Sequence, residues 1–194
     1  MRTLCLTFAI LSLLSPLANA VSGRDTGTST ITFSNITGGG TCNMEVDSPI
    51  QIGAGDIDPL PAIGADWVGL AITSFDVNLE SCSGLGDSGL TPKITVRGST
   101  LTGRNDSLFS TGTNNTGFGV IIYDTKSPTT PGTISIVPNS GTIPIPGHDT
   151  GILSGNVPVS LKAAVGCGAT ADCAATKLRP GNFSATITFD FAYQ

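Results

Sequence analysis

Four cysteines, Cys42, Cys82, Cys167 and Cys173, are spaced for disulfide chemistry. An even number of cysteines in an exported chain indicates disulfides, and four cysteines allow three pairings. Cys167 and Cys173 are close in sequence and are expected to close a local loop, which leaves Cys42 to pair with Cys82. A zinc site is the competing interpretation, but it needs closely spaced ligand pairs and the chain has only one. We therefore expect two disulfides and no metal.

A second motif, Gly86-Asp-Ser-Gly89, resembles the nucleophile loop of trypsin-like proteases. A serine nucleophile needs a histidine base beside it. The chain has a single histidine, His148, which lies in a turn-rich stretch far along the sequence. The protease loop would continue with Gly-Pro, whereas Leu90-Thr91 follow here. Only a fold that brought Ser88, His148 and an acid together would create a site, so we expect no enzyme, no catalytic residue and no cofactor.

Composition indicates an all-β protein. The chain has 194 residues, enough for one domain with a core, with 12% charged residues, 25 glycines and 12 prolines. Many Thr, Ser, Val and Ile residues with frequent turn formers predict short strands and tight turns. The formal net charge of -5 disfavours nucleic acid and anionic membrane surfaces as partners.

Residues 1–20 are predicted to be a signal peptide. Arg2 gives a positive start, the stretch 4–14 is apolar, and Ala18-Asn19-Ala20 is typical of a cleavage site. The apolar run is too short to span a bilayer, and no second segment is long enough. We expect an exported protein with Val21 as its mature N-terminus, from which Cys5 has been removed.

The end of the chain carries its clearest periodicity. Apolar residues occupy every second position, which predicts a half-buried strand: Phe183, Ala185, Ile187, Phe189, Phe191 and Tyr193. Only Gln194 follows this strand, so no later segment is expected to pair with it. A long apolar strand at a sheet edge favours pairing with another chain.

The remaining elements are short. A polar arm, residues 21–36, contains a strand in which Ile31 and Phe33 share one face. Val157, Val159 and Leu161 alternate in the strand that precedes the last one. Further strands are expected over 42–53 (a pair around Pro49), 67–83, 93–97, 117–124 and 133–137, and Ile143–Pro146 is expected to be extended but outside any central ladder. Strands at short intervals predict a single β-sandwich.

Several of these features together resemble the pilus subunits of the bacterial chaperone–usher pathway, the type 1 fimbrial protein family. Tyr193 is next to last, and Gly181 is the fourteenth residue counted from the end, with alternating apolar residues between them. Phe33 precedes Cys42 by nine residues, and the stretches 75–82 and 115–124 are also similar to family strands. The chain departs from the pattern with Asn35, where many members have glycine, and with the additional pair Cys167/Cys173.

This resemblance implies an immunoglobulin-like β-sandwich that lacks its final strand and is completed by a donor strand from another subunit. It implies three segments: signal peptide 1–20, donor arm 21–36 and sandwich domain 37–194. A periplasmic chaperone would first fill the open groove, and at the outer-membrane usher the arm of the next subunit would replace it, with Ile31 and Phe33 entering pockets. The groove and chaperone contact would comprise Val157, Val159, Leu161, Phe183, Ile187, Phe189, Phe191 and Tyr193.

Two functions follow from the resemblance. The first is a structural subunit of a surface fimbria that polymerises by strand exchange and supports cell adhesion. The second is a minor tip or adaptor subunit with its own glycan-binding surface and a host-surface receptor. Adhesins of this pathway are usually longer, have two domains and need no donor arm, which favours the first function. Trp67 and Tyr123 would be candidates for stacking on a sugar, although core roles are favoured for both.

Overall fold

The computed structural model describes residues 28–33, 40–52, 66–84, 90–124, 135–148, 153–179 and 181–194. The predicted signal peptide, residues 21–27 and 34–36 of the arm, and Ser88 lie outside these residues. The elements are β1 (Thr28–Phe33), β2 (Gly40–Val46), β3 (Ile50–Gln51), β4 (Leu70–Gly84), β5 (Pro92–Gly98), β6 (Gly119–Tyr123), β7 (Thr142–Pro144), β8 (Gly155–Gly166), two short 3₁₀ turns, η1 (Thr170–Asp172) and η2 (Ala175–Lys177), and β9 (Ser184–Tyr193).

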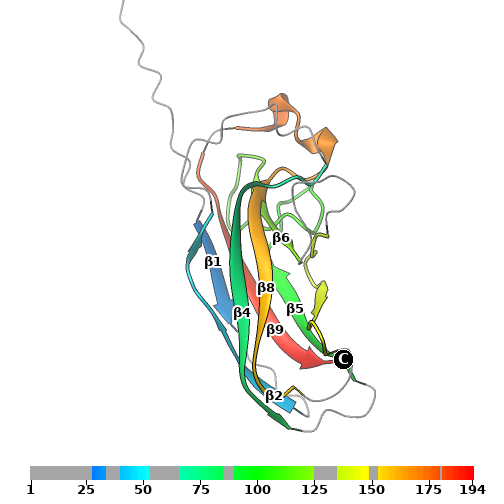
Figure 1. Cartoon of the computed structure of the whole chain (residues 1–194). Coiled ribbons are helices and arrows are strands. Elements are labelled where there is room, and N and C mark those ends of the chain that lie inside the picture. Colours follow the sequence, from blue (N-terminus) through cyan, green and yellow to red (C-terminus); the bar gives the residue numbers. More distant parts are fainter. Residues whose placement is uncertain are drawn as a thin grey trace, which may run out of the picture.

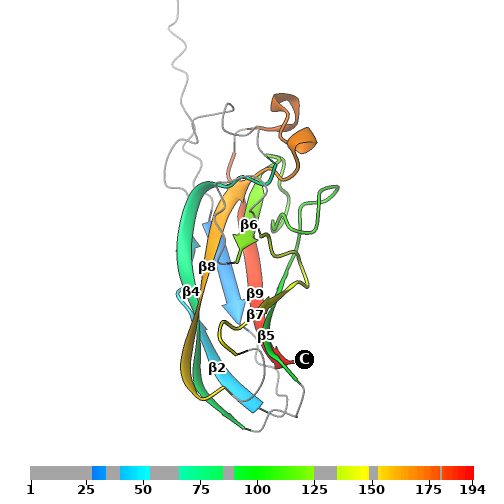
Figure 2. The same cartoon turned by 45° about the vertical axis from the view of Figure 1, so that its right-hand side comes forward.

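The described strands form two sheets that pack face to face as a sandwich (Figures 1 and 2). One sheet has the order β3-β1-β9-β5-β7 and the other the order β2-β4-β8-β6. All pairings are antiparallel except that of β1 with β9, which is parallel. The predicted all-β sandwich of immunoglobulin-like type is therefore confirmed.

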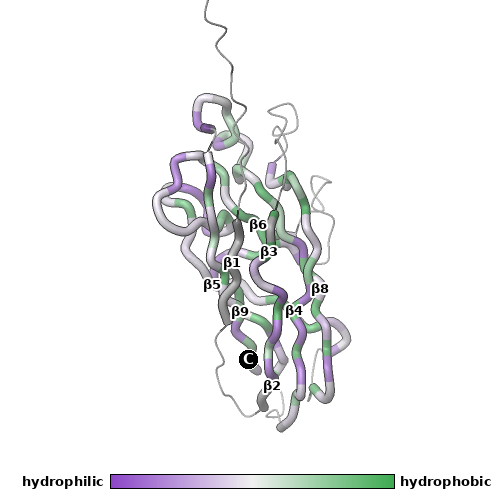
Figure 3. The backbone as a smooth tube through the Cα atoms, turned by 90° about the vertical axis from the view of Figure 1, so that its left-hand side faces the viewer, coloured by the Kyte–Doolittle hydropathy of each residue, from purple (hydrophilic) through white to green (hydrophobic). Residues whose placement is uncertain are grey.

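The core lies between the two sheets and follows from the alternation in the sequence. Along β4 the hydropathy colour changes repeatedly between hydrophilic and hydrophobic (Figure 3). Its inward side chains Phe75, Val77 and Leu79 are buried, and they join Ile187 and Phe189 of β9 in one hydrophobic cluster. Each fully buried side chain of this size stabilises the fold by about 1.5–3 kcal/mol.

Two predicted strands behave differently in the structure. The pair expected around Pro49 is split between the sheets, because β2 pairs with β4 while β3 pairs with β1. Of the strand expected over 133–137, the described residues 135–137 form one isolated bridge, between Tyr123 and Ile136. The stretch 143–146 lies as predicted, since Pro144 ends β7, an edge strand where a missing N–H costs no central hydrogen bond.

The strand that completes the first sheet comes from the same chain. The sequence predicted that another subunit would supply the strand beside β9, and here β1 supplies it. Among the described residues from β2 onward, none contributes a strand to that position. The arm therefore satisfies, within one molecule, the backbone edge that was expected to be filled from outside.

Candidate functional site: the slot beside β9

The inward face of β9 forms one wall of the site. Ala185, Ile187, Phe189 and Phe191 are all buried, as their alternation predicts. The ring of Phe189 lies 6.0 Å from that of Phe75 across the sandwich, between ring centroids. Phe191 and Tyr193 make an edge-to-face contact with centroids 5.3 Å apart, a favourable aromatic geometry. Aromatic packing thus anchors the C-terminal half of β9 in the core.

One edge of β9 is held by the body of the domain. β5 pairs with residues 187–193, and beyond the end of β5 Thr111 takes over. The Thr111 backbone N–H donates to the Ser184 carbonyl (2.7 Å), and the Thr186 backbone N–H donates to Thr111 Oγ1 (2.7 Å). This edge therefore needs no external strand.

An ion pair strengthens the same edge. Asp190 points to the face of β9 opposite the core, yet it is only 5% exposed. Arg97 of β5 donates from Nε to Asp190 Oδ2 at 2.9 Å. This charge-assisted hydrogen bond ties β9 to β5 independently of the other edge.

The other edge of β9 is occupied by β1 alone among the described residues. β1 lies parallel to β9, with Thr28 opposite Ser184 and Phe33 opposite Phe189. On its far side β1 pairs with β3 at two positions. β1 therefore fills a slot between two strands, and its removal would leave backbone donors and acceptors of both unpaired.

The predicted groove residues of β8 lie in the facing sheet. Val159 and Leu161 are buried and Val157 is half-buried, and all three belong to or pack against the same cluster as Phe189. Phe183, just before β9, is half-buried against this cluster too. The structure thus brings the predicted groove residues together in one core, and their role as an acceptor groove stays a prediction. Strand β1 contains Ile31 and Phe33, and Asn35 lies outside the described residues.

Both disulfides have the predicted pairing. Cys42 and Cys82 join β2 to β4 across 40 residues of sequence, and Cys167 and Cys173 close a six-residue step. In the chain-entropy model the longer loop contributes about 4 kcal/mol and the shorter one about 2 kcal/mol. The first disulfide therefore carries more of the stability of the sandwich.

The other candidate residues do not form a site in the structure. His148 lies in a turn where its backbone N–H donates to the Ile145 carbonyl (3.1 Å). Tyr123 is fully buried and donates from its hydroxyl to the Trp67 carbonyl (2.9 Å), so it offers no surface to a sugar. Burial raises the pKa of the Tyr123 phenol. Trp67 is half-buried, and the described residues contain no group of side chains arranged to hold a metal ion.

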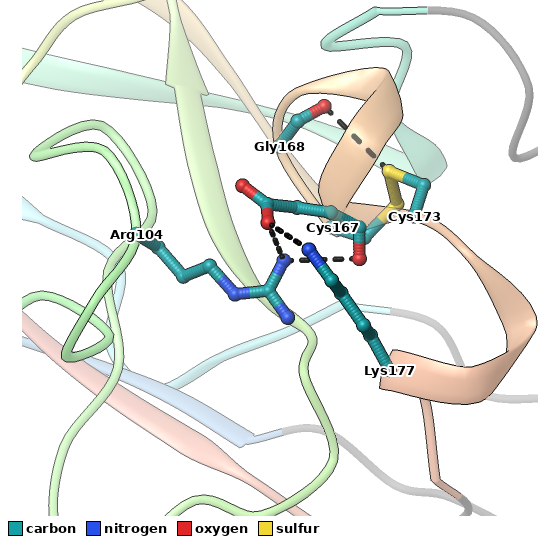
Figure 4. A network of polar contacts seen from close by, with 6 residues as sticks. Arg104, Cys167, Gly168, Cys173 and Lys177 are labelled. Atoms are coloured by element: carbon teal, nitrogen blue, oxygen red, sulfur yellow. Dashed lines mark hydrogen bonds and ion pairs between the residues drawn. A yellow bond between two sulfur atoms is a disulfide. The ribbon is translucent and has the colours of Figure 1, made fainter.

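The sequence did not predict that residues 167–179, which we call the pole loop, are held in place by ion pairs. Arg104 donates from Nη1 to the Asp172 carbonyl (2.9 Å) and lies 3.0 Å from Asp172 Oδ1 (Figure 4). Lys177 Nζ lies 3.1 Å from the same carboxylate oxygen. The hydrogen bond from Lys177 lowers the pKa of Asp172; burial opposes this shift, and the charges of Arg104 and Lys177 add to the lowering. Asp172 lies within the loop closed by Cys167 and Cys173 and Lys177 lies just after it, but no local pattern in the sequence indicates Arg104 as their partner.

The architecture defines an immunoglobulin-like sandwich with a strand slot at β9, and the comparisons agree with this class. The family model for fimbrial protein matches residues 28–194. The chain belongs to the fimbrial protein family. It is a structural pilus subunit of a surface fimbria and interacts with other pilus subunits.

Solved structures give more distant similarities. The P pilus rod subunit PapA is 18% identical, with a TM-score of 0.48 over 79% of this chain and 99% of that chain. A chaperone–usher pilus studied for rod uncoiling is also 18% identical, with a TM-score of 0.48 over 79% and 87%. The CupB6 tip adhesin from Pseudomonas aeruginosa is 13% identical, with a TM-score of 0.44 over 89% of this chain and 41% of that chain. No curated protein matches the sequence.

Within the described residues, no helix has the length and apolar character needed to cross a membrane.

Proposed function

We propose that this subunit joins the fimbria by donating β1 to the slot beside β9 of another copy or of a related subunit. The observation that supports this proposal is the place of β1. It lies between β3 and β9, yet it is joined to the body only through residues 34–39. A strand held at one end by a short connection can leave its slot while the ladders β9-β5-β7 and β2-β4-β8-β6 stay paired; only the two-residue β3 loses its partner.

The energetics favour a filled slot. β1 pairs with β9 at six successive positions, so an empty slot would expose a row of unpaired backbone groups. Strand addition at such an edge gains main-chain hydrogen bonds along its length, and side-chain pockets give it specificity. The slot is therefore stable with the chain's own arm, with a chaperone strand, or with the arm of a neighbouring subunit.

These alternatives define a route to the cell surface. During export the slot would be filled by a periplasmic chaperone, and at the outer-membrane usher a neighbouring arm would replace it. The product is a structural polymer that supports adhesion of the cell, and we propose no catalytic step in it. The tip-adhesin alternative is not favoured, because Tyr123, one of its two candidate stacking residues, is buried.

Deletion of the arm tests this proposal. A mature protein that lacks residues 21–36 should still bind the chaperone but should not polymerise. A second variant that lacks only residues 21–27 retains β1 and serves as the matched control, which should form polymers. Polymers of the 21–36 deletion, seen by electron microscopy of purified protein, would contradict strand donation.

A further inference from the structure

The pole loop lies where a neighbouring subunit would have to attach. It connects β8 to β9 at the end of the sandwich where β9 begins (Figures 1 and 2). Thr28, the first residue of β1, is opposite Ser184, the first residue of β9, so the slot opens at this same end. The loop is tied down on two sides: the Trp67 backbone N–H donates to the Gly168 carbonyl (3.1 Å), and the Arg179 backbone N–H donates to the Thr116 carbonyl (2.8 Å).

The pole loop is also rigid for a surface loop. The Cys167–Cys173 disulfide closes it, the ion pair of Asp172 with Arg104 fixes it to the neighbouring loop, and the ion pair of Asp172 with Lys177 lies within it (Figure 4). Its outward side chains are nevertheless exposed: Thr170, Ala171, Ala174, Thr176, Lys177 and Arg179. A preorganised surface loses little conformational entropy when a partner binds it.

The direction of β1 in this structure follows from its short connection to β2. Gly40, where β2 begins, is opposite Gly84 at the far end of β4. The chain from Phe33 to Gly40 reaches about 25 Å at most. Phe189, opposite Phe33, packs against Phe75, nine residues or roughly 30 Å of strand before Gly84, so bridging this distance needs the whole reach of the connection.

A reversed arm could not be reached within one molecule. In an antiparallel arrangement over the same residues, Phe33 would lie beside Ser184. This would add roughly 17 Å to the distance, since five strand residues span about that length. The chain's own arm must therefore run parallel to β9.

An arm from another copy is not bound by this connection. Antiparallel pairing is slightly more stable per residue than parallel pairing, so a donated arm is expected to run antiparallel to β9. Its Phe33 then lies at the Ser184 end of the acceptor. The donor's Gly40 must follow within about 25 Å of that point, at the end that carries the pole loop.

We propose that the pole loop of one subunit is the seat for the next copy of this chain, and that it contacts the end of the neighbour's sandwich formed by the start of β2 and the end of β4. This inference rests on the proposed strand donation. The exposed cations of the pole loop, Lys177 and Arg179, would face Glu80, which lies four residues before the end of β4 in the neighbour. The additional disulfide thus stabilises a contact surface of the polymer.

A photo-cross-linking residue placed in the full chain tests the seat. It is introduced at Ala171 or, as a second position, at Thr176, both exposed in the pole loop. Lys93, half-exposed at the opposite end of the sandwich, where it pairs with Ala192, probes the alternative in which the next copy attaches at that end, and it should not cross-link to residues 40–45 of a neighbour. In assembled fibres, both pole-loop positions should cross-link two copies, with the second site mapped by mass spectrometry to residues 40–45 or 78–84.

The outcomes separate the two proposals. Fibres in which Lys93 cross-links to the neighbour's residues 40–45, while neither pole-loop position does, would overturn the seat and leave strand donation standing. Fibres without any cross-link from Ala171 or Thr176 would overturn it as well. A full chain that never forms fibres would instead contradict strand donation, and the seat with it.

Discussion

Phe33 lies opposite Phe189 in the parallel ladder that joins β1 to β9. This pair marks the end of six consecutive pairings through which the arm completes the sheet of its own domain. The same backbone edge would accept an arm from another subunit, because hydrogen bonds of the ladder do not depend on which chain supplies the strand. The described sheet is completed by the chain's own arm, and the proposed function requires that this arm can be exchanged.

A charge introduced on the buried face near the C-terminal end of β9 should prevent the subunit from folding. We expect Phe191→Asp to abolish accumulation of the folded subunit in the periplasm, because Phe191 is 5% exposed and an unpaired buried carboxylate costs several kcal/mol. Thr188→Asp is the control, since Thr188 lies on the other face of β9 and is half-exposed. Its accumulation should stay near that of the wild type. Immunoblots of periplasmic extracts measure both, and wild-type levels of Phe191→Asp would refute the assignment of this face to the core.

Substitution of two glycines tests whether the pole loop packs against the body of the domain. Gly117 and Gly103 have φ angles of 81° and 76°, so alanine costs about 1 kcal/mol of strain at either site. A Cβ at Gly117 would lie 2.5 Å from the Lys177 carbonyl oxygen, whereas one at Gly103 would meet nothing within 4 Å. Gly117→Ala should therefore lower the melting temperature clearly more than Gly103→Ala. Equal losses would show that the pole loop does not pack on Gly117 in solution.

The Asp172 ion pairs should give the pole loop an acid-labile component. The lowered pKa of Asp172 means that its ionised form is favoured in the folded state. The stabilisation is present at neutral pH and is lost as the pH falls through that lowered pKa, below the ordinary value of 3.8. The melting temperature of Asp172→Asn should thus be lower than that of the wild type at pH 7. The two melting temperatures should become equal near the lowest pH at which the protein still folds. A difference in melting temperature that does not change with pH would contradict this assignment.

Local patterns predicted much of this structure. The alternation from Phe183 to Tyr193 is visible because a strand with one buried face has a period of two. The two disulfides follow from the proximity of Cys167 and Cys173 in the sequence. These features depend on neighbours along the chain, which is why the sequence alone reveals them.

The remaining features depend on contacts between distant residues. Pro49 separates β2 from β3, but only the tertiary structure places them in different sheets. The bond from Arg104 to Asp172 spans 68 residues, and no periodicity indicates it. The pairing of β1 with its own β9 depends on the length of the connection from Phe33 to Gly40 relative to the sandwich, which a strand pattern does not encode.

Amide hydrogen exchange along β9 tests most directly whether the slot belongs to the arm. In the full chain, amides of residues 184–189 that face β1 should be protected, and deletion of residues 21–36 should expose them while those bonded to β5 stay protected. Addition of a synthetic peptide of residues 21–36 to the deleted protein should restore the protection. If these amides remain protected in the deleted protein without the peptide, the sheet is complete without the arm, and the account of strand donation is wrong.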